Sequence, residues 1–259
     1  MEVLKVSDMK VGDTLYLGKL LNPSTAVVND LLWVKVSSDN HFMLEQSSGY
    51  PRMQMDEKEP QSASRLRRAR GNAFYPQTAI AQWLNASEAG WYTPFGDTDV
   101  PPKYARHTGF LSLFSNQERA VLQEQQITVV VPNGYKRENG AKAEMKCLVA
   151  LPSLSQIAAV RQEDDKLMEE GQAFEYFMHD RRPYASCLLR TSIDGYALYT
   201  DAYHDVRYSN TNPYVDLYIS PVIQAKADIE VDGVNGCFCL VGMNTGVFTA
   251  SELDSIWLQ

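Results

Sequence analysis

Short apolar runs alternate with turn-forming residues over the first fifty positions. An apolar run follows the turn signal Gly12-Asp13, the run LLWVKV (residues 31–36) has the pattern of a buried or half-buried strand, and HFMLEQ follows the turn residues SSDN. Short strands joined by such turns are typical of antiparallel neighbours. The pattern therefore predicts a β-meander over residues 1–50 and leaves open whether it packs as a subdomain.

Residues 51–72 are polar and charged and show no periodicity, which predicts a long polar loop at the surface. Within it, RLRRAR contains four arginines in six residues. Such a run can bind an acidic partner or lie in a solvated loop. The solvated loop is favoured here, since the run has no basic neighbours and few interleaved aromatic residues.

Three segments carry the signals of short helices. In TAIAQWLNA the apolar residues have i, i+3, i+4 spacing behind Thr78, a candidate N-cap. Ser115 and Glu118 have the spacing of a capping box, and Ser153 and Gln156 repeat it. We therefore expect two or three short helices in the middle of the chain.

The remaining apolar segments predict strands. ITVVVPNGYK contains a β-branched run that ends at a proline and an Asn-Gly turn. After residue 181, the runs SCLLRTS, YALYT, VDLYISPVI and CFCLVG are separated by Asp, Asn, Gly and Pro residues. The expected fold class is α+β, with short twisted antiparallel sheets, a few short helices and long irregular loops. Because no linker divides the chain, we predict a single domain over residues 1–259.

The composition argues against two kinds of partner, nucleic acids and membranes. The formal net charge is -8 and the pI is about 5.1, so the mean field of the protein repels a phosphate backbone and we expect no nucleic-acid partner. The first ten residues lack the apolar stretch of a signal peptide, and no run reaches the length of a membrane span. We expect a cytoplasmic protein as synthesised, with no membrane insertion.

The four cysteines do not have the spacing of a zinc site, since no second C-x-x-C or H-x-x-x-H element accompanies them. On a strand, Cys237 and Cys239 would point to one face and Phe238 to the other. Buried free thiols in a reducing compartment are the favoured interpretation. We expect neither a metal nor another cofactor.

Motifs of common enzyme classes are missing from the sequence, including G-x-S-x-G, G-x-G-x-x-G, G-x-x-x-x-G-K-[ST] and H-E-x-x-H. Asp201, His204 and Asp205 form the best chemical cluster, and they could bind a divalent ion or act as an acid–base pair. The alternative is an ordinary polar loop. No catalytic residue can be assigned from the sequence.

Tyrosine is concentrated in one part of the chain: eight of the fourteen tyrosines lie between Tyr176 and Tyr218. Tyr gives large, rigid contacts while Ser, Asn and Asp adapt their hydrogen bonds, which is the composition of recognition surfaces. The alternative is that the tyrosines line one face of a sheet. The candidate binding residues are Tyr196, Tyr199, Asp201, Tyr203, His204, Asp205, Arg207, Tyr208, Asn210, Asn212 and Tyr214.

A series of weak motifs resembles a known family. The order is QWLN, SEAGWYTPF, VPPKY, GFLSLFSNQE, LPSLSQI, LLRTS and YISPVI, from about Gly12 to the end of the chain. This order resembles a domain-of-unknown-function family found in Gram-positive gut bacteria and their prophages. Two departures stand out: Leu188-Leu189 replaces an aromatic-Leu pair, and Ser220-Pro221-Val222 replaces R-P-A, so an arginine of the family pattern is lost.

The resemblance implies a core that is similar to C-type-lectin-like and formylglycine-generating-enzyme-like folds, with the loops of residues 194–218 as the ligand face. The leading hypothesis is a non-catalytic recognition module, a phage or prophage surface or tail accessory protein, that binds a protein or a glycan. Two alternatives stay open. One is a structural subunit that forms a homo-oligomer or a virion-associated assembly, and the other is an oxidative enzyme of the formylglycine-generating type.

Overall fold

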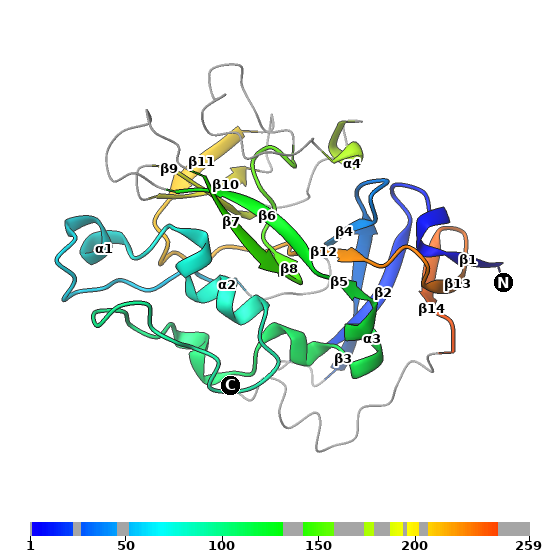
Figure 1. The fold of residues 1–259 in the computed structure, drawn as a ribbon, viewed down its shortest axis with the longest axis horizontal. Helices are drawn as coiled ribbons and strands as arrows, with labels where there is room; N and C mark the ends of the chain where they lie inside the picture. Colours follow the sequence, from blue (N-terminus) through cyan, green and yellow to red (C-terminus); the bar gives the residue numbers. More distant parts are fainter. Residues whose placement is uncertain are drawn as a thin grey trace.

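The computed structural model describes residues 2–22, 27–45, 52–131, 142–157, 174–178, 187–193, 196–201 and 207–242. Within this part of the chain, nine strands form one strongly curled sheet with the shape of a half-barrel (Figure 1). The strands are β1 (Glu2–Lys5), β2 (Thr14–Asn22), β3 (Val27–Lys35), β4 (His41–Leu44), β5 (Leu122–Gln123), β8 (Val149–Ala150), β12 (Val222–Ala225), β13 (Glu230–Val234) and β14 (Cys237–Leu240).

The large sheet joins the two ends of the described chain. Its order is β1-β13-β14-β2-β3-β4-β12-β5, and β8 also pairs with β12. Strands β2, β3 and β4 are consecutive antiparallel neighbours, but strands from the end of the chain flank them on both sides. The expectation of purely antiparallel sheets is wrong, because β14 pairs with β2 in parallel. The N-terminal strands thus share one sheet with the C-terminal strands.

Two smaller sheets lie on the side of the molecule away from β1 and β13 (Figure 1). One contains β9 (Leu188–Ile193), β10 (Tyr196–Asp201) and β11 (Arg207–Thr211), with β10 in the centre. The other is the pair of β6 (Gln125–Val130) and β7 (Lys142–Cys147). Mixed α+β architecture is confirmed by these sheets and the helices beside them.

The helices are short, and the caps of two of them match the sequence signals. They are α1 (Arg65–Arg70), α2 (Ala79–Leu84), α3 (Asn116–Val121) and α4 (Glu175–Met178). The Thr78 hydroxyl accepts a hydrogen bond from the Ala81 amide, and Ser115 and Glu118 form a reciprocal capping box. Ser153 and Gln156 also bond reciprocally, at a turn. In the described residues, no helix combines the length and apolar character needed to cross a bilayer.

Aromatic side chains connect the sheet to the helical segments. The Trp33 ring lies 6.4 Å from Phe110 and 6.1 Å from Phe114, and Trp83 lies 5.3 Å from Phe110 between ring centroids. Both tryptophans are fully buried, and each indole N–H donates to a backbone carbonyl, of Leu17 and of Thr108. The main core cluster therefore extends across the strands and helices.

The expectation of a surface loop over residues 51–72 is wrong for its first part. Met53 and Met55 are buried, and the backbone of Met53 exchanges two hydrogen bonds with Leu217, at 2.8 and 3.0 Å. Residues 65–70 then form α1, which has Ser64 as its N-cap. Methionines at alternate positions turn inward, and the polar residues around them hide this short apolar pattern in the sequence.

Candidate functional site

The described part of the predicted tyrosine-rich site lies on two strands of the three-stranded sheet and on the turn after them. Tyr196, Tyr199 and Asp201 lie on β10, Arg207, Tyr208 and Asn210 lie on β11, and Asn212 and Tyr214 follow. The register pairs Tyr199 with Ser209 and Asp201 with Arg207. The hairpin thus brings these candidates together, whereas Tyr203, His204 and Asp205 lie outside the described residues.

Three basic side chains from the segment 52–70 cover tyrosine rings of this region. Arg52 lies 4.8 Å from the Tyr218 ring centroid, Lys58 lies 4.0 Å from Tyr214, and Arg70 lies 3.5 Å from Tyr196. We call these three pairs the cation–tyrosine ladder. Each pair of this kind is worth about 0.5–1 kcal/mol at an exposed site and more where water is excluded.

Backbone pairing positions two of the three tyrosines of the ladder, Tyr214 and Tyr218. Residues 53–55 run antiparallel to residues 213–217, and the Met55 amide donates to the Pro213 carbonyl at 2.8 Å. The Tyr196, Tyr214 and Tyr218 side chains are half-buried, so each ring also keeps an accessible part. The ladder therefore holds aromatic rings and cations in fixed positions next to solvent.

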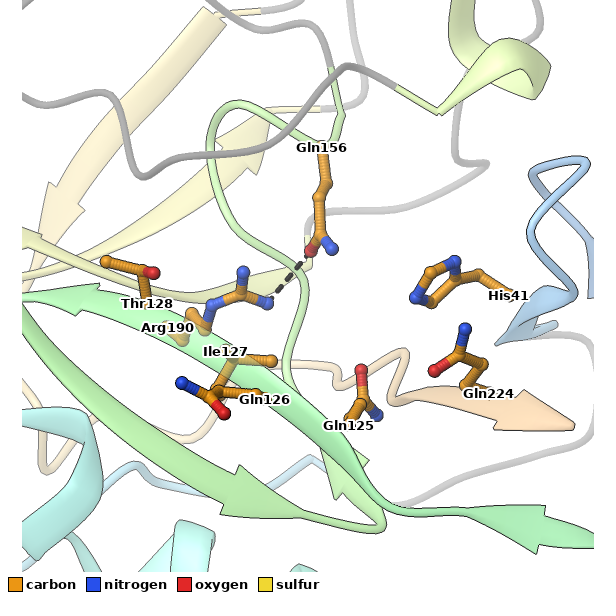
Figure 2. Close-up of a pocket in the computed structure, with 8 residues that line it drawn as sticks. All are labelled: His41, Gln125, Gln126, Ile127, Thr128, Gln156, Arg190 and Gln224. Atoms are coloured by element: carbon orange, nitrogen blue, oxygen red, sulfur yellow. Dashed lines mark hydrogen bonds between the residues drawn. The ribbon is translucent and has the colours of Figure 1, made fainter.

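A polar pocket of about 280 Å³ lies between the large sheet and the small sheets (Figure 2). Four elements and one turn supply its lining: β4, β6, β9 and β12, and the turn at residues 154–157. The lining residues are His41, Gln125, Gln126, Ile127, Thr128, Gln156, Arg190 and Gln224. Seven of these eight side chains are polar, which is unusual for ligand pockets, whose walls are mostly apolar.

Arg190 gives the pocket a permanent positive charge. Arg190 is only 3% exposed. Its Nη1 atom donates to the Leu151 carbonyl and to Gln156 Oε1, both at 2.8 Å. The Arg190 amide also donates to the Pro152 carbonyl. These bonds fix the guanidinium in place, and its charge is poorly screened at this depth.

His41 faces Arg190 from the opposite wall (Figure 2). Its Nδ1 is hydrogen-bonded with Ser37 Oγ at 3.0 Å, and its ring packs on Phe174 at 5.3 Å between centroids. Burial lowers the pKa of His41 below its ordinary value; Asp39 opposes this effect and the charge of Arg190 adds to it. The imidazole is therefore neutral at neutral pH.

Hydrogen bonds to the backbone orient two glutamine amides at the other end. Gln125 Nε2 donates to the carbonyls of Leu148 and Val222, both at 3.2 Å, and Gln224 Nε2 donates to the Asp39 carbonyl at 3.1 Å. Their Oε1 atoms are turned toward the pocket, as Figure 2 shows. The amide orientation follows from these bonds, since only the nitrogen can donate.

Two of the four cysteines have the expected buried thiols. Burial raises the pKa of Cys147 and of Cys187 to about 12, so both thiols keep their protons. Cys237 is exposed and Cys239 half-buried, with Phe238 buried on the opposite face. The shared face is confirmed, but the expectation of buried thiols is wrong for this pair. No group of three metal-ligating side chains gathers within the described ranges.

Sequence reasoning missed both the ladder and the pocket. The ladder joins residues that are more than a hundred positions apart, and the pocket collects residues from five separate segments. One signal was available in LLRTS: a strand that buries its leucines also contains Arg190. A buried arginine needs hydrogen-bonding partners around it, and such a residue is a marker of polar sites.

Comparison with known proteins adds one result. No curated protein and no solved structure matches the chain. A family model does match, over residues 39–220, which is more than half of the chain but less than the expected extent from about Gly12 to the end. The chain belongs to the family described as Domain of unknown function (DUF6273).

Proposed function

We propose that the protein is a non-catalytic recognition module that binds a protein or a glycan through the surface around the cation–tyrosine ladder. The ladder carries the proposal, because each of its three tyrosine rings has a cation 3.5 to 4.8 Å from its centroid. Tyr and Arg are the residues that most often dominate binding surfaces. Rings that are already held in place lose little conformational entropy when a partner binds.

The ladder suits a ligand with both apolar and acidic groups. The accessible part of each tyrosine ring can stack on an apolar side chain or on the C–H face of a sugar. The neighbouring ammonium and guanidinium groups can pair with carboxylates of the ligand, in spite of the acidic net charge of the whole chain. A neutral polar loop would not offer this combination.

The oxidative-enzyme alternative depends on thiol chemistry. Cys187 is 1% exposed and its thiol keeps its proton, because burial raises its pKa to about 12. A protonated thiol is a poor nucleophile and a poor metal ligand. The recognition function is therefore the better supported of the two.

The proposed function also includes a biological context and an architecture for the module. We propose a phage or prophage surface or tail accessory protein with a C-type-lectin-like architecture, and a structural assembly subunit is the alternative. Light scattering over a range of protein concentrations separates these two roles, because an assembly subunit would form oligomers as the concentration rises.

The test uses substitutions in the ladder and a matched tyrosine elsewhere. Tyr196→Ala and Tyr214→Ala each remove one ring of the ladder, and Tyr16→Ala removes an exposed tyrosine of β2 in the large sheet. Binding is measured on an array of neutral and acidic oligosaccharides and on a library of displayed peptides. We expect ligands of the parent protein to bind about thirtyfold more weakly to the ladder variants.

The Tyr16 variant should bind like the parent. Thermal unfolding of all three variants is the control, since the ladder tyrosines are half-buried. Unchanged binding by the ladder variants would contradict the proposal. Loss of folding in both ladder variants would also contradict it, because the rings would then serve the core.

A further inference from the structure

We propose that the polar pocket beside Arg190 is a second binding site, for a small ligand that carries a carboxylate at one end and an N–H or O–H donor at the other. This site is distinct from the ladder surface, and none of the residues predicted for binding lines it. A free amino acid, a peptide end and an acidic sugar share this chemistry.

The Arg190 end of the pocket is lined by side chains that carry hydrogen-bond donors. The guanidinium supplies the charge, and Nη1 is anchored by Leu151 and Gln156. Gln156 Oε1 accepts hydrogen bonds from the Arg190 side chain and the Ser153 amide, so the Gln156 amide nitrogen is the group turned into the pocket (Figure 2). Guanidinium and amide donors in fixed positions are complementary to a carboxylate.

The opposite end offers acceptors. The Nε2 atoms of Gln125 and Gln224 are bonded to backbone carbonyls, so the two Oε1 atoms face the pocket (Figure 2). Carbonyl oxygens attract an ammonium, hydroxyl or amide N–H group and repel an anion. The pocket is thus polarised, with a donor end at Arg190 and an acceptor end at the two glutamines.

Volume and charge restrict the ligand further. About 280 Å³ is near the lower limit of ligand pockets, which favours a molecule of the size of an amino acid or a monosaccharide. Neutral His41 adds no second charge, so a ligand with one carboxylate is matched better than a phosphate with two charges. Ile127 is the apolar member of the lining and can contact a short carbon chain.

Titration calorimetry of the full chain at pH 7 tests the proposal. The probes are glycine, L-alanine and L-glutamine, each compared with its α-amide, and D-glucuronate compared with D-glucose. We expect at least one acid to bind, and its neutral counterpart to bind about tenfold more weakly or not at all. Amino-acid binding would identify a free amino acid or a peptide end as the source, and glucuronate binding would identify an acidic sugar.

Two substitutions locate the binding. Arg190→Gln should weaken binding of the acid about tenfold or more. Because Arg190 is buried and this variant can fail to fold, Gln224→Leu provides a second measurement at the half-buried acceptor end, with an expected loss of about threefold to tenfold. Gln123→Leu is the matched control, since Gln123 is exposed, lies opposite Gln224 on the neighbouring strand and does not line the pocket.

The proposal is overturned if no acid binds to the folded parent protein at about 10 mM. It is equally overturned if the neutral counterparts bind as tightly as the acids, or if Gln224→Leu binds like the Gln123→Leu control.

Discussion

At the level of single residues, two buried ionisable side chains, Lys35 and Asp56, have different surroundings. Lys35 is 1% exposed, and its ammonium donates to the carbonyls of Val6 and Met9 and to Asn40 Oδ1, at 2.8 to 2.9 Å. All three of its protons are thus used. Asp56 is also buried, but Asp99 and Glu59 lie near it and add negative charge. The first residue is compensated, whereas the second favours its neutral form.

Asp56 predicts a dependence of stability on pH. Burial raises the pKa of its carboxyl from 3.8 to about 8; the amide of Glu57 opposes this shift, and Asp99 and Glu59 increase it. Between these two pH values the folded chain holds a proton that the unfolded chain has released. The stabilisation from this group is therefore complete below pH 3.8 and is lost as the pH rises through about 8.

Asp56→Asn tests this dependence, because the amide resembles the protonated carboxyl and keeps the oxygen that accepts from the Glu57 amide. We expect the variant to unfold at a higher temperature than the parent at pH 8, with a smaller difference at pH 5. Differential scanning calorimetry at both values measures this change. An equal difference at the two pH values would show that Asp56 does not titrate in this range.

At the level of elements, one carboxylate joins a helix to the large sheet. Glu118 Oε2 accepts from the Ser115 amide and closes the capping box of α3, while Oε1 accepts from the Gly18 amide at 2.8 Å. Gly18 has a φ of 83° and lies where the register of β2 against β3 shifts. This irregularity releases the Gly18 N–H from the strand ladder and presents it to the helix.

Because Glu118 has two roles, we expect its substitution to lower the free energy of unfolding more than substitution of Ser115, the other residue of the capping box. Ser115→Ala removes only the N-cap and should lower the free energy of unfolding by about 1 kcal/mol. Glu118→Ala removes its side of the box and also leaves the Gly18 amide without its partner, so we expect a loss of about 2–3 kcal/mol. Urea unfolding of both variants gives the comparison. Equal losses would mean that the contact with Gly18 contributes nothing.

At the level of the whole molecule, the family match covers only part of the large sheet. Residues 39–220 contain β4, β5 and β8 of the large sheet, while its other six described strands lie outside this range. Trp33 on β3 packs directly on Phe110 and Phe114, which lie within the match. A boundary at residue 39 thus cuts through the core rather than between two domains.

A fragment of residues 39–220 should therefore fail to fold by itself. We expect it to lack the near-ultraviolet circular dichroism of the full chain and to exchange its amide hydrogens rapidly, because it loses the strands that cover Phe110 and Phe114. The full chain measured in the same buffer is the reference. A native spectrum from the fragment would show that the outer strands are accessory.

Local signals in the sequence predicted local structure well. Thr78, Ser115 and Glu118 were recognised as caps, because a cap depends on a few neighbouring residues. The same approach could not pair Arg70 with Tyr196, or β14 with β2, since such contacts depend on where distant segments meet. Asn235 and Gly236 are turn-forming residues before the predicted strand CFCLVG, but nothing in them identifies β2 as a neighbour of that strand.

The parallel contact between β14 and β2 also affects how the chain is made. The Thr14 hydroxyl donates to the Gly236 carbonyl, 222 positions later. During synthesis, β2 leaves the ribosome long before its outer neighbour exists, and its unpaired backbone groups stay open to other chains in the meantime. Since this part of the sheet closes only after β13 and β14 have been made, we infer slow folding, with a yield that depends on protection of this nascent edge.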